Sequence, residues 1–315
     1  MDETTERHLV KANSPTKKSR LRPIHLVLGW ALLGAMSSPA LCIIGYVNVV
    51  ITNGYQLLEN PLDMDGINSV TNVFRYAPVG TRVWLWNVTN QRFDPPSVLT
   101  DAAGGWTLNL LLPPGRGFAL HSPAVWTNTF TGSVVPCPGS CRGNFVAGGN
   151  TLTLLGSMLP LQGALTNAIF QFTPRDGDTV LQYSKAAQRY LDAGTYYSGF
   201  GWYPTEPELA VAESFFLRHP GPDTNWIQCL DPPMSFSVAS RAGSVTASEP
   251  GPAIESFALR DRNITLKISK TIKPYKVQFS ANGQIWTDVA ADQTGATWKG
   301  PLPPGPTGFF RVVGP

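Results

Sequence analysis

The sequence predicts an all-β protein, and three observations point to this fold class. Charged residues make up 14% of the chain, against about 25% in an ordinary soluble domain. Turn formers are abundant, with 30 Gly and 28 Pro among 315 residues. Short segments such as "TRVWLW" and "GFAL" are rich in β-branched and aromatic residues and are bounded by Gly, Pro, Asn or Asp, as strands are. Together these features predict compact structure built from many short strands.

The first 40 residues have the pattern of a secretory signal peptide. Six Lys or Arg residues precede the apolar segment "IHLVLGWALLGAM" at 24–36, and the small residues "SSPA" follow it. This apolar run is short of the about 20 residues that a membrane-spanning helix needs, so we expect a leader cleaved after Ala40. Cleavage after Cys42, lipidation of Cys42 and retention as a membrane anchor are the alternatives. The mature chain is expected to have no transmembrane span and to be secreted or part of the cell envelope.

Removal of this leader leaves a chain with no formal net charge. The leader contains six of the 24 basic and three of the 21 acidic residues, so 18 of each remain. Proteins that bind nucleic acid use an excess of positive charge against the phosphates. We therefore expect no nucleic-acid partner, and the sequence leaves the oligomeric state open.

Export also makes the cysteines disulfide candidates, because compartments outside the cytoplasm are oxidising. Cys137, Cys141 and Cys229 belong to the mature chain whatever the cleavage site, and Cys42 joins them if cleavage follows Ala40. The motif "CPGSC" would close a small ring if Cys137 paired with Cys141, but four cysteines allow other pairings as well.

The chain repeats itself at an offset of 97 residues. Equivalent residues include Leu57 and Leu154, Gly80 and Gly177, Val83 and Val180, Gln91-Arg92-Phe93 and Gln188-Arg189-Tyr190, Phe118 and Phe215, and Phe130 and Ile227. One offset that persists over this length is hard to obtain by chance. We therefore expect two homologous small β domains in tandem, 43–134 and 141–231, which form either separate domains or one pseudo-symmetric pair.

The remaining segments are expected to add a linker and a third β module. Residues 232–253 are rich in Pro, Ser and Gly, as linkers are. Residues 254–315 contain further strand patterns, including the alternating "YKVQFS" before an Asn-Gly turn, and predict a small β-sandwich-like C-terminal module. Helical periodicity is weak throughout, and "NSVTNVF" and "LTNAIF" are expected to form no more than a helical turn each.

Several of these segments resemble those of a known group of proteins. The segments "GYVNVVITNGYQLLENPL", "VWLW", "GGW", "PPGRGFAL" and "TFTGSV" together resemble the tandem β-repeat of secreted, largely uncharacterised proteins of environmental bacteria. The tail, with "YKVQFSANGQIWTDV" and the terminal "FFRVVG", is similar to a β module that ends many such exported proteins. The resemblance covers most of residues 43–231 and 270–314. It implies export and β architecture, and it transfers no activity and no functional residue.

Aromatic residues after glycine-rich loops are the best ligand-binding candidates. Trp106 follows "AAGG", and Trp202 and Tyr203 follow "SGFG", where their rings could stack on sugars. Trp84 and Trp86 are weaker candidates, because their equivalents in the second repeat are Leu and Tyr. An apolar position that changes shape in this way is typical of a core.

A weak metal candidate lies in "NPLDMDGIN". Asp63, Asp65 and Asn68 place oxygen ligands in a short loop, as calcium loops do. The spacing differs from that of a calcium loop, a distal acidic ligand is missing, and the second repeat lacks these residues. We therefore favour an exposed turn and expect no metal and no cofactor.

Candidate catalytic residues are few, and we expect none to be catalytic. His121 and His219 lie near corresponding strand ends, where a surface position is expected, and the motif of a nucleophilic serine is missing. Glu206, Glu208 and Glu213 cluster in the second repeat, but the aligned segment of the first repeat contains no acid.

These observations predict an exported, non-catalytic structural or interaction protein of the cell envelope or extracellular space. A carbohydrate-binding accessory protein that uses the loop aromatics is the first alternative, and a secreted hydrolase that uses the three glutamates is a weaker one. In the two Gln-Arg-aromatic triplets, a hairpin register places Gln and the aromatic on one face of the strand. Arg92 and Arg189 then remain on the other face as the part that a partner can contact.

Overall fold

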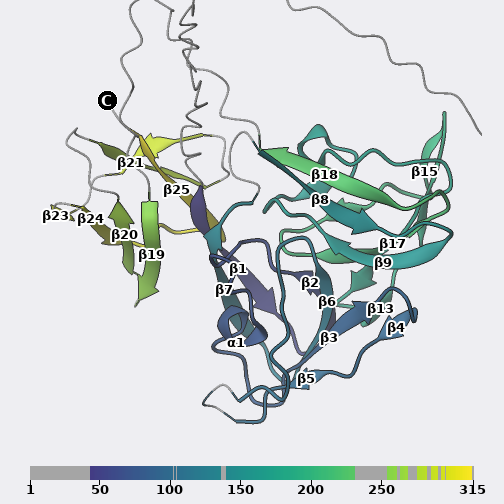
Figure 1. Cartoon of the computed structure of the whole chain (residues 1–315), viewed down its shortest axis with the longest axis horizontal. Coiled ribbons are helices and arrows are strands. Elements are labelled where there is room, and N and C mark those ends of the chain that lie inside the picture. The colour runs from purple at the N-terminus through teal and green to yellow at the C-terminus, as the bar shows by residue number, and fades with distance from the viewer. Residues whose placement is uncertain are drawn as a thin grey trace, which may run out of the picture. The chain divides into compact units, whose positions relative to one another are not determined.

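The computed structural model describes residues 43–101, 103, 105–135, 140–230, 254–260, 263–268, 275–281, 285–289, 292–294 and 296–313. These residues form antiparallel sheets, which confirms the all-β fold class (Figure 1). A short helix, α1 (Val70–Val73), and a 3-10 turn, η1 (Ala168–Phe170), lie in the two segments expected to form helical turns. The predicted signal peptide at 1–40 and the linker at 232–253 lie outside the described residues.

We call residues 43–134 the first half and residues 140–230 the second half. The strands of the first half are β1 (Ile44–Ile51), β2 (Gly54–Glu59), β3 (Arg82–Asn87), β4 (Arg92–Phe93), β5 (Ser97–Val98), β6 (Gly117–Ser122) and β7 (Trp126–Ser133). The strands of the second half are β8 (Ser140–Val146), β9 (Thr151–Gly156), β10 (Gly163–Ala164), β11 (Thr179–Leu181), β12 (Tyr183–Ser184), β13 (Arg189–Tyr190), β14 (Gly194–Tyr197), β15 (Gly201–Tyr203), β16 (Glu208–Leu209), β17 (Ser214–His219) and β18 (Thr224–Leu230).

The same pattern of strand pairs occurs in both halves. β2 pairs with β6 and β6 with β3 in the first half, and β9 pairs with β17 and β17 with β11 in the second. The register is also the same, because Leu57 lies opposite Ala119 and their equivalents, Leu154 and Phe216, lie opposite each other. Residues 97 positions apart therefore occupy the same places in these strand pairs. The division into independent domains stays a prediction.

The pair formed by the first and last strands of each half, β1 with β7 and β8 with β18, breaks this equivalence by one residue. Val47 of β1 lies opposite Phe130 of β7, whereas Asn144, the equivalent of Val47, lies opposite Trp226 of β18. A slip of one residue turns every side chain to the other face of a strand. Phe130 is accordingly buried at 2% exposure, while Ile227 is 55% exposed. The expected equivalence of Phe130 and Ile227 is therefore wrong, because Trp226 takes the buried position instead.

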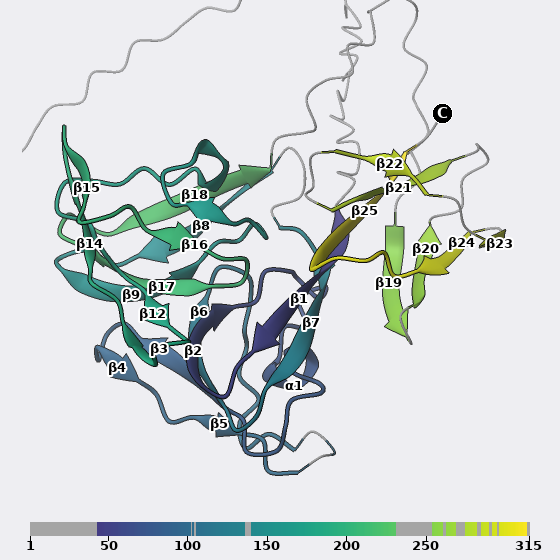
Figure 2. The same ribbon diagram turned by 180° about the vertical axis from the view of Figure 1, so that it is seen from behind.

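The C-terminal strands complete a sheet of the first half. They are β19 (Ile254–Arg260), β20 (Asn263–Ile268), β21 (Lys276–Ser280), β22 (Thr287–Asp288), β23 (Asp292–Thr294), β24 (Thr297–Pro301) and β25 (Thr307–Val313). β25 pairs with β1 on the side opposite β7, and both views show the two strands side by side (Figures 1 and 2). β19, β20, β24 and β23 form a separate four-stranded sheet.

Strand β1 therefore contributes to two cores. The side chain of Tyr46 packs in a cluster with Leu266, Trp298 and Phe310 of the C-terminal strands. Its neighbour Val47 packs in the core of the first half. Successive side chains of a strand point to opposite faces, so one strand can fill both cores. The expected sandwich-like module thus shares β1 with the first half.

The two halves meet through equivalent positions. Leu57, Ala119, Leu154 and Phe216 form one buried cluster between them. The backbone contacts are also reciprocal, because Glu59 N donates to the Ala212 carbonyl and Gly156 N donates to the Gly115 carbonyl, each pair being the other shifted by one repeat. Such an exchange is typical of a two-fold interface between like units. The pair of halves is pseudo-symmetric.

Candidate ligand-binding site

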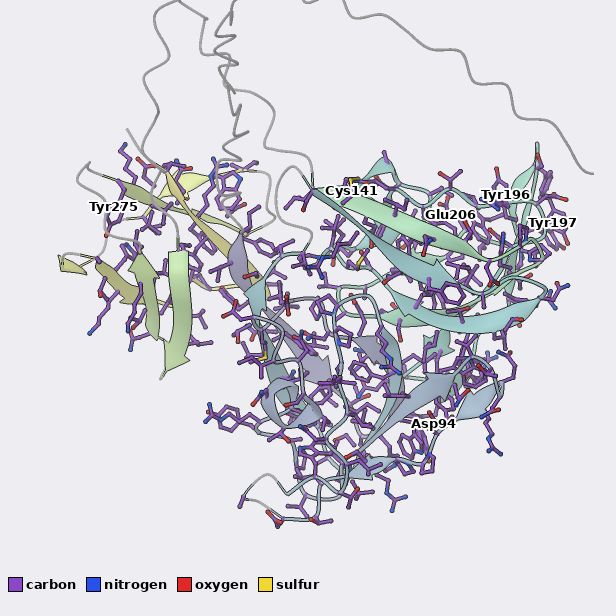
Figure 3. The ribbon with its side chains drawn as sticks, in the orientation of Figure 1. Asp94, Cys141, Tyr196, Tyr197, Glu206 and Tyr275 are labelled. Atoms are coloured by element: carbon purple, nitrogen blue, oxygen red, sulfur yellow. A yellow bond between two sulfur atoms is a disulfide. The ribbon has the colours of Figure 1, made fainter. Side chains whose placement is uncertain are left out.

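The β14–β15 hairpin contains two of the predicted aromatic residues, Trp202 and Tyr203. Tyr196 lies opposite Trp202 in the register, their ring centroids are 5.5 Å apart, and Trp202 packs against the core of the second half. Tyr197 lies opposite Gly201 and Tyr203 opposite Thr195, which places both tyrosines on the other face of the hairpin. Figure 3 shows Tyr196 and Tyr197 at this edge of the second half.

The outer face of this hairpin is an exposed aromatic surface. Tyr197, Phe200 and Tyr203 are 47%, 74% and 60% exposed. Gly201 lies between the two tyrosines, and its missing side chain leaves the backbone open there. Trp106, the third predicted residue, packs instead against the core of the first half. Trp106 and Trp202 therefore belong to different clusters, and the hairpin presents Tyr203 alone of the three predicted residues.

A second candidate, the aromatic groove, lies between the two halves. Its volume is about 280 Å³, and five aromatic side chains line it: Tyr55, Trp84, Phe93, Tyr183 and Tyr190. Tyr55 and Trp84 have ring centroids 5.8 Å apart, and Tyr183 and Tyr190 are 5.2 Å apart. The side chains come from both halves, so a search within one repeat could not have found this set. Trp84, expected in a core, lies here at the boundary between the halves.

Burial changes the ionisation of the tyrosines in the groove. Loss of solvent raises the pKa of Tyr183, and the neighbouring Tyr55 raises it further. The pKa of Tyr190 is raised in the same way, first by burial and then by Tyr183. The phenols of Tyr183 and Tyr190 therefore stay protonated at neutral pH, and each can donate or accept a hydrogen bond.

In the weak calcium candidate, the side-chain oxygens of Asp63 and Asn68 accept hydrogen bonds from the protein itself. Asp63 Oδ1 accepts hydrogen bonds from Asn68 Nδ2 at 2.6 Å and from Gly66 N at 2.9 Å. Asn68 Oδ1 in turn accepts from Asn60 Nδ2 and Met64 N, and Asp65 lies exposed at the tip of the turn. These bonds hold a turn in which Asp65 is exposed and Asn68 is buried. Among the described residues, no group of three or more His, Cys, Asp or Glu side chains is placed to hold a metal ion.

His219 lies in the core rather than at the surface, so its expected position is wrong. Its side chain is buried, and Nδ1 is 2.5 Å from Asp178 Oδ1. Asp178 also accepts a hydrogen bond from Arg175 N, which ties the pair to a turn. The sequence carried a signal for this pair, because the equivalent residues in the first half are the neutral Thr81 and Ser122. Two linked changes between the repeats marked a buried hydrogen-bonded pair.

The imidazole of His219 is closed off on its second nitrogen. A side-chain carbon on Gly221 would lie 2.7 Å from Nε2, so the backbone of Gly221 covers that atom. A general base needs this nitrogen within reach of a reacting group. The arrangement is suited to holding the turn and poorly suited to proton transfer. His121, by contrast, is half-buried, and its ring lies 4.7 Å from that of Tyr55.

The three glutamates of the hydrolase hypothesis make separate contacts. Glu206 accepts hydrogen bonds from the backbone N and the hydroxyl of Thr166. Glu213 accepts from Gln182 Nε2 at 3.2 Å and from Ala210 N at 2.9 Å, and burial raises its pKa despite these bonds. Glu208 is exposed on β16. Glu213 lines a hollow of about 410 Å³ beside the aromatic groove.

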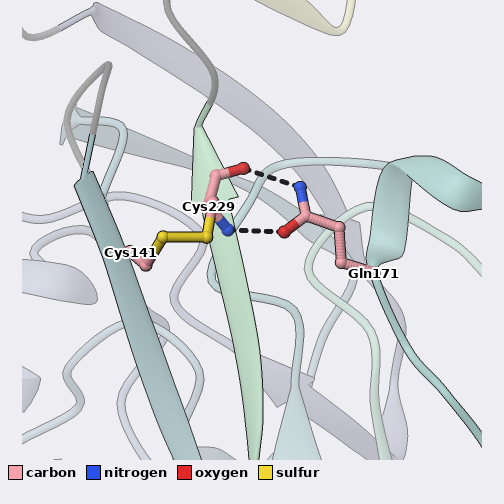
Figure 4. Close-up of a disulfide and its surroundings, with 3 residues drawn as sticks. All are labelled: Cys141, Gln171 and Cys229. Atoms are coloured by element: carbon pink, nitrogen blue, oxygen red, sulfur yellow. Dashed lines mark hydrogen bonds between the residues drawn. A yellow bond between two sulfur atoms is a disulfide. The ribbon is translucent and has the colours of Figure 1, made fainter.

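A disulfide joins Cys141 and Cys229 across the β8–β18 pair (Figure 4). The small ring within "CPGSC" is therefore not formed by Cys141, and Cys137 lies outside the described residues. Gln171 holds the same strand from its other edge, because its side-chain amide donates to the Cys229 carbonyl and accepts from Cys229 N. The strand end is thus fixed on both sides.

Comparison with known proteins adds no functional name. No family model matches the chain, and a search of curated proteins gives no match either. Within the described part of the chain, no helix is both long and apolar enough to cross a membrane. The site geometry is therefore the basis for a functional proposal.

Proposed function

We propose that the chain is an exported protein that acts by binding, as a structural or interaction component of the cell envelope or extracellular space. One observation carries the proposal: Tyr197, Phe200 and Tyr203 are exposed together on one short hairpin. Large aromatic side chains gathered in water are typical of surfaces that meet a partner. The Cys141–Cys229 disulfide is consistent with an extracellular protein.

The engagement of the reactive side chains supports binding rather than catalysis. The oxygens of Glu206 hold Thr166, and those of Glu213 hold Gln182 and Ala210. These contacts give both carboxylates a structural role, which accounts for them without a catalytic one.

Cosedimentation with isolated envelopes tests this proposal. The wild-type protein should sediment with the envelopes, and the triple variant Tyr197→Ser, Phe200→Ser, Tyr203→Ser should stay in solution with an unchanged melting temperature. Tyr76→Ser is the matched control, because Tyr76 is 81% exposed and lies in the first half. Equal sedimentation of the triple variant and wild type would contradict a role for the hairpin.

A carbohydrate ligand is the more specific candidate, favoured by the shared face of Tyr197 and Tyr203. Aromatic rings on one flat strand face can stack on successive sugar rings. On a glycan array, Tyr203→Ala and Trp202→Ala should lose binding, the second through collapse of the inner face. Trp106→Ala should retain it, because Trp106 packs in the other half. The absence of any glycan binding at millimolar concentrations would rule this candidate out.

A secreted hydrolase remains the weaker candidate, favoured only by the raised pKa of Glu213 beside a hollow. A protonated carboxyl can serve as a general acid. Activity screening of wild type and of Glu206→Gln, Glu208→Gln and Glu213→Gln tests it. Hydrolysis that is equal in all four proteins, or missing from wild type, excludes these residues as catalysts.

We also propose that the two halves arose by duplication, as in the secreted β-repeat proteins that the sequence resembles. The constant offset of 97 residues and the recurring strand pairs support this origin. Expression of residues 43–134 and 141–231 as separate chains tests whether each half is a domain. The reciprocal interface predicts that the separated halves associate when mixed.

A further inference from the structure

The aromatic groove breaks the pseudo-symmetry of the interface around it. At the position related by the repeat, the ring of Phe216 fills the space against Trp86, with centroids 4.8 Å apart. In the groove the equivalents are Ala119 and Tyr183, so a methyl group stands where the other side has a phenyl ring. An unfilled hollow of this size costs stability. The small side chain of Ala119 therefore leaves a space in the groove, whereas Phe216 fills the equivalent space on the other side of the interface.

The phenols supply the polar atoms of the groove. Tyr55 and Tyr190 are both exposed, so their rings are open to a ligand. Gln56 lies next to Tyr55 on β2, but successive side chains of a strand point to opposite faces. Its side chain therefore lies on the core face of the strand with Leu58, and its buried Oε1 is out of reach of a ligand in the groove.

The chemistry of the lining selects the class of ligand. Its residues are neutral, and they combine aromatic faces with the phenols of Tyr55, Tyr183 and Tyr190. A pyranose ring matches this set, since its C–H face stacks on aromatic rings while its hydroxyls donate and accept hydrogen bonds. A charged ligand would find no counter-charge in the groove itself.

We propose that the aromatic groove binds a neutral hexopyranose unit of a glycan, with the sugar hydroxyls hydrogen-bonded to the phenols of Tyr183 and Tyr190. This inference rests on the proposal that the chain binds carbohydrate, and it assigns a second site away from the β14–β15 hairpin. The adjoining hollow of about 410 Å³ shares Gln56, Leu57 and Tyr183 with the groove. The chain of sugars therefore continues from the groove into this hollow, towards Glu213.

Two variants remove the site in different ways. Ala119→Phe fills the groove with the ring that the equivalent position already carries, and Tyr183→Phe removes a phenol while keeping the aromatic ring. Cellohexaose, laminarihexaose and mannohexaose are titrated separately, with calorimetry and tryptophan fluorescence as the readouts. We expect at least one hexasaccharide to bind the wild type and to quench or shift the emission of Trp84. Each variant should bind it at least tenfold more weakly, with a melting temperature no lower than that of wild type.

A control outside both surfaces and the hairpin variants together separate this inference from the carbohydrate proposal. Tyr76→Ser, at an exposed position that does not line the groove, should bind the hexasaccharide as wild type does. Loss of binding in Tyr197→Ala and Tyr203→Ala, with wild-type affinity in folded Ala119→Phe and Tyr183→Phe, would leave the carbohydrate proposal standing and overturn the groove. Failure of all three hexasaccharides to bind wild type would overturn the groove as a hexopyranose site. A response to a polyproline peptide in place of the sugars would also overturn it, since aromatic grooves bind such peptides as well.

Discussion

Gln91 and Gln188 hold the two halves together in the same way, each by clasping the backbone of the other half. Gln91 Nε2 donates to the Leu152 carbonyl at 3.1 Å, and Leu152 N donates to Gln91 Oε1 at 3.0 Å. Gln188 makes the same two bonds with Tyr55, at 2.9 Å and 2.7 Å. Both glutamines have φ of 50°, in the left-handed region, and both also donate to the residue three positions earlier. We call this pair of hydrogen bonds from a glutamine side chain to the backbone of the other half a clasp, and the pseudo-symmetric interface has two of them.

Replacement of either glutamine should therefore weaken the contact between the halves. We expect Gln91→Ala and Gln188→Ala each to lower the free energy of unfolding by about 1–2 kcal/mol, because a net hydrogen bond contributes about 1 kcal/mol and the clasp leaves backbone groups unpaired. Urea unfolding measures this loss. Arg92→Ala is the matched control, since Arg92 is exposed in the next position and should cost less than about 0.5 kcal/mol. A glutamine variant as stable as the arginine variant would contradict the role of the clasp.

The clasps show which features of the fold could be predicted from the sequence and which could not. Repeated Gln-Arg-aromatic triplets correctly predicted an equivalent hairpin in each half, because an unchanged offset preserves strand register. The partners of Gln91 and Gln188 lie in the opposite half, and a repeat reveals which residues are equivalent but not which ones touch. For the same reason the aromatic groove could not be predicted from the sequence, because its side chains come from both halves. The sequence held one sign of the groove, because the small Ala119 aligns with the large Phe216. The role of Arg92 and Arg189 in meeting a partner stays a prediction.

Loss of the disulfide should cost more than loss of a clasp. Cys141 and Cys229 are 88 residues apart, and closing a loop of this length lowers the entropy of the unfolded chain by an amount worth about 4–5 kcal/mol in the loop-entropy estimate. We expect the double variant Cys141→Ser, Cys229→Ser to unfold at a correspondingly lower urea concentration. Gln171→Ala serves as the control, because it releases the same strand end but keeps the disulfide. If the double variant unfolded at the midpoint of Gln171→Ala or later, the disulfide would contribute little.

Glu59 should make the stability depend on pH. Its carboxyl is buried between the halves and accepts from Gly115 N, and burial raises its pKa well above the ordinary value of 4.5. The folded protein then binds more protons than the unfolded chain between the two pKa values, so stability should fall as pH rises through that window. Glu59→Gln keeps an acceptor for Gly115 N but cannot ionise. Its stability relative to wild type should increase as pH rises above 4.5, measured by urea unfolding at a series of pH values. A constant difference between the two proteins would show that Glu59 does not carry the effect.

Exchange of Ala119 and Phe216 should show whether the space in the aromatic groove lowers the stability of the folded protein. Phe216 is buried and packs on Trp86, with Phe93 and Tyr190 further out at 6.1 and 6.2 Å between centroids. Phe216→Ala should lower the free energy of unfolding by about 3–5 kcal/mol, because it removes these contacts and leaves a cavity. Ala119→Phe fills a space that is already present and should be neutral or stabilising. The double exchange moves the hollow to the other side of the interface, so its stability should lie above that of Phe216→Ala alone. A double-mutant cycle measures the coupling between the two positions. If Ala119→Phe destabilised the protein as much as Phe216→Ala does, the groove would be too small for a ring, and the space would be closed to a sugar as well.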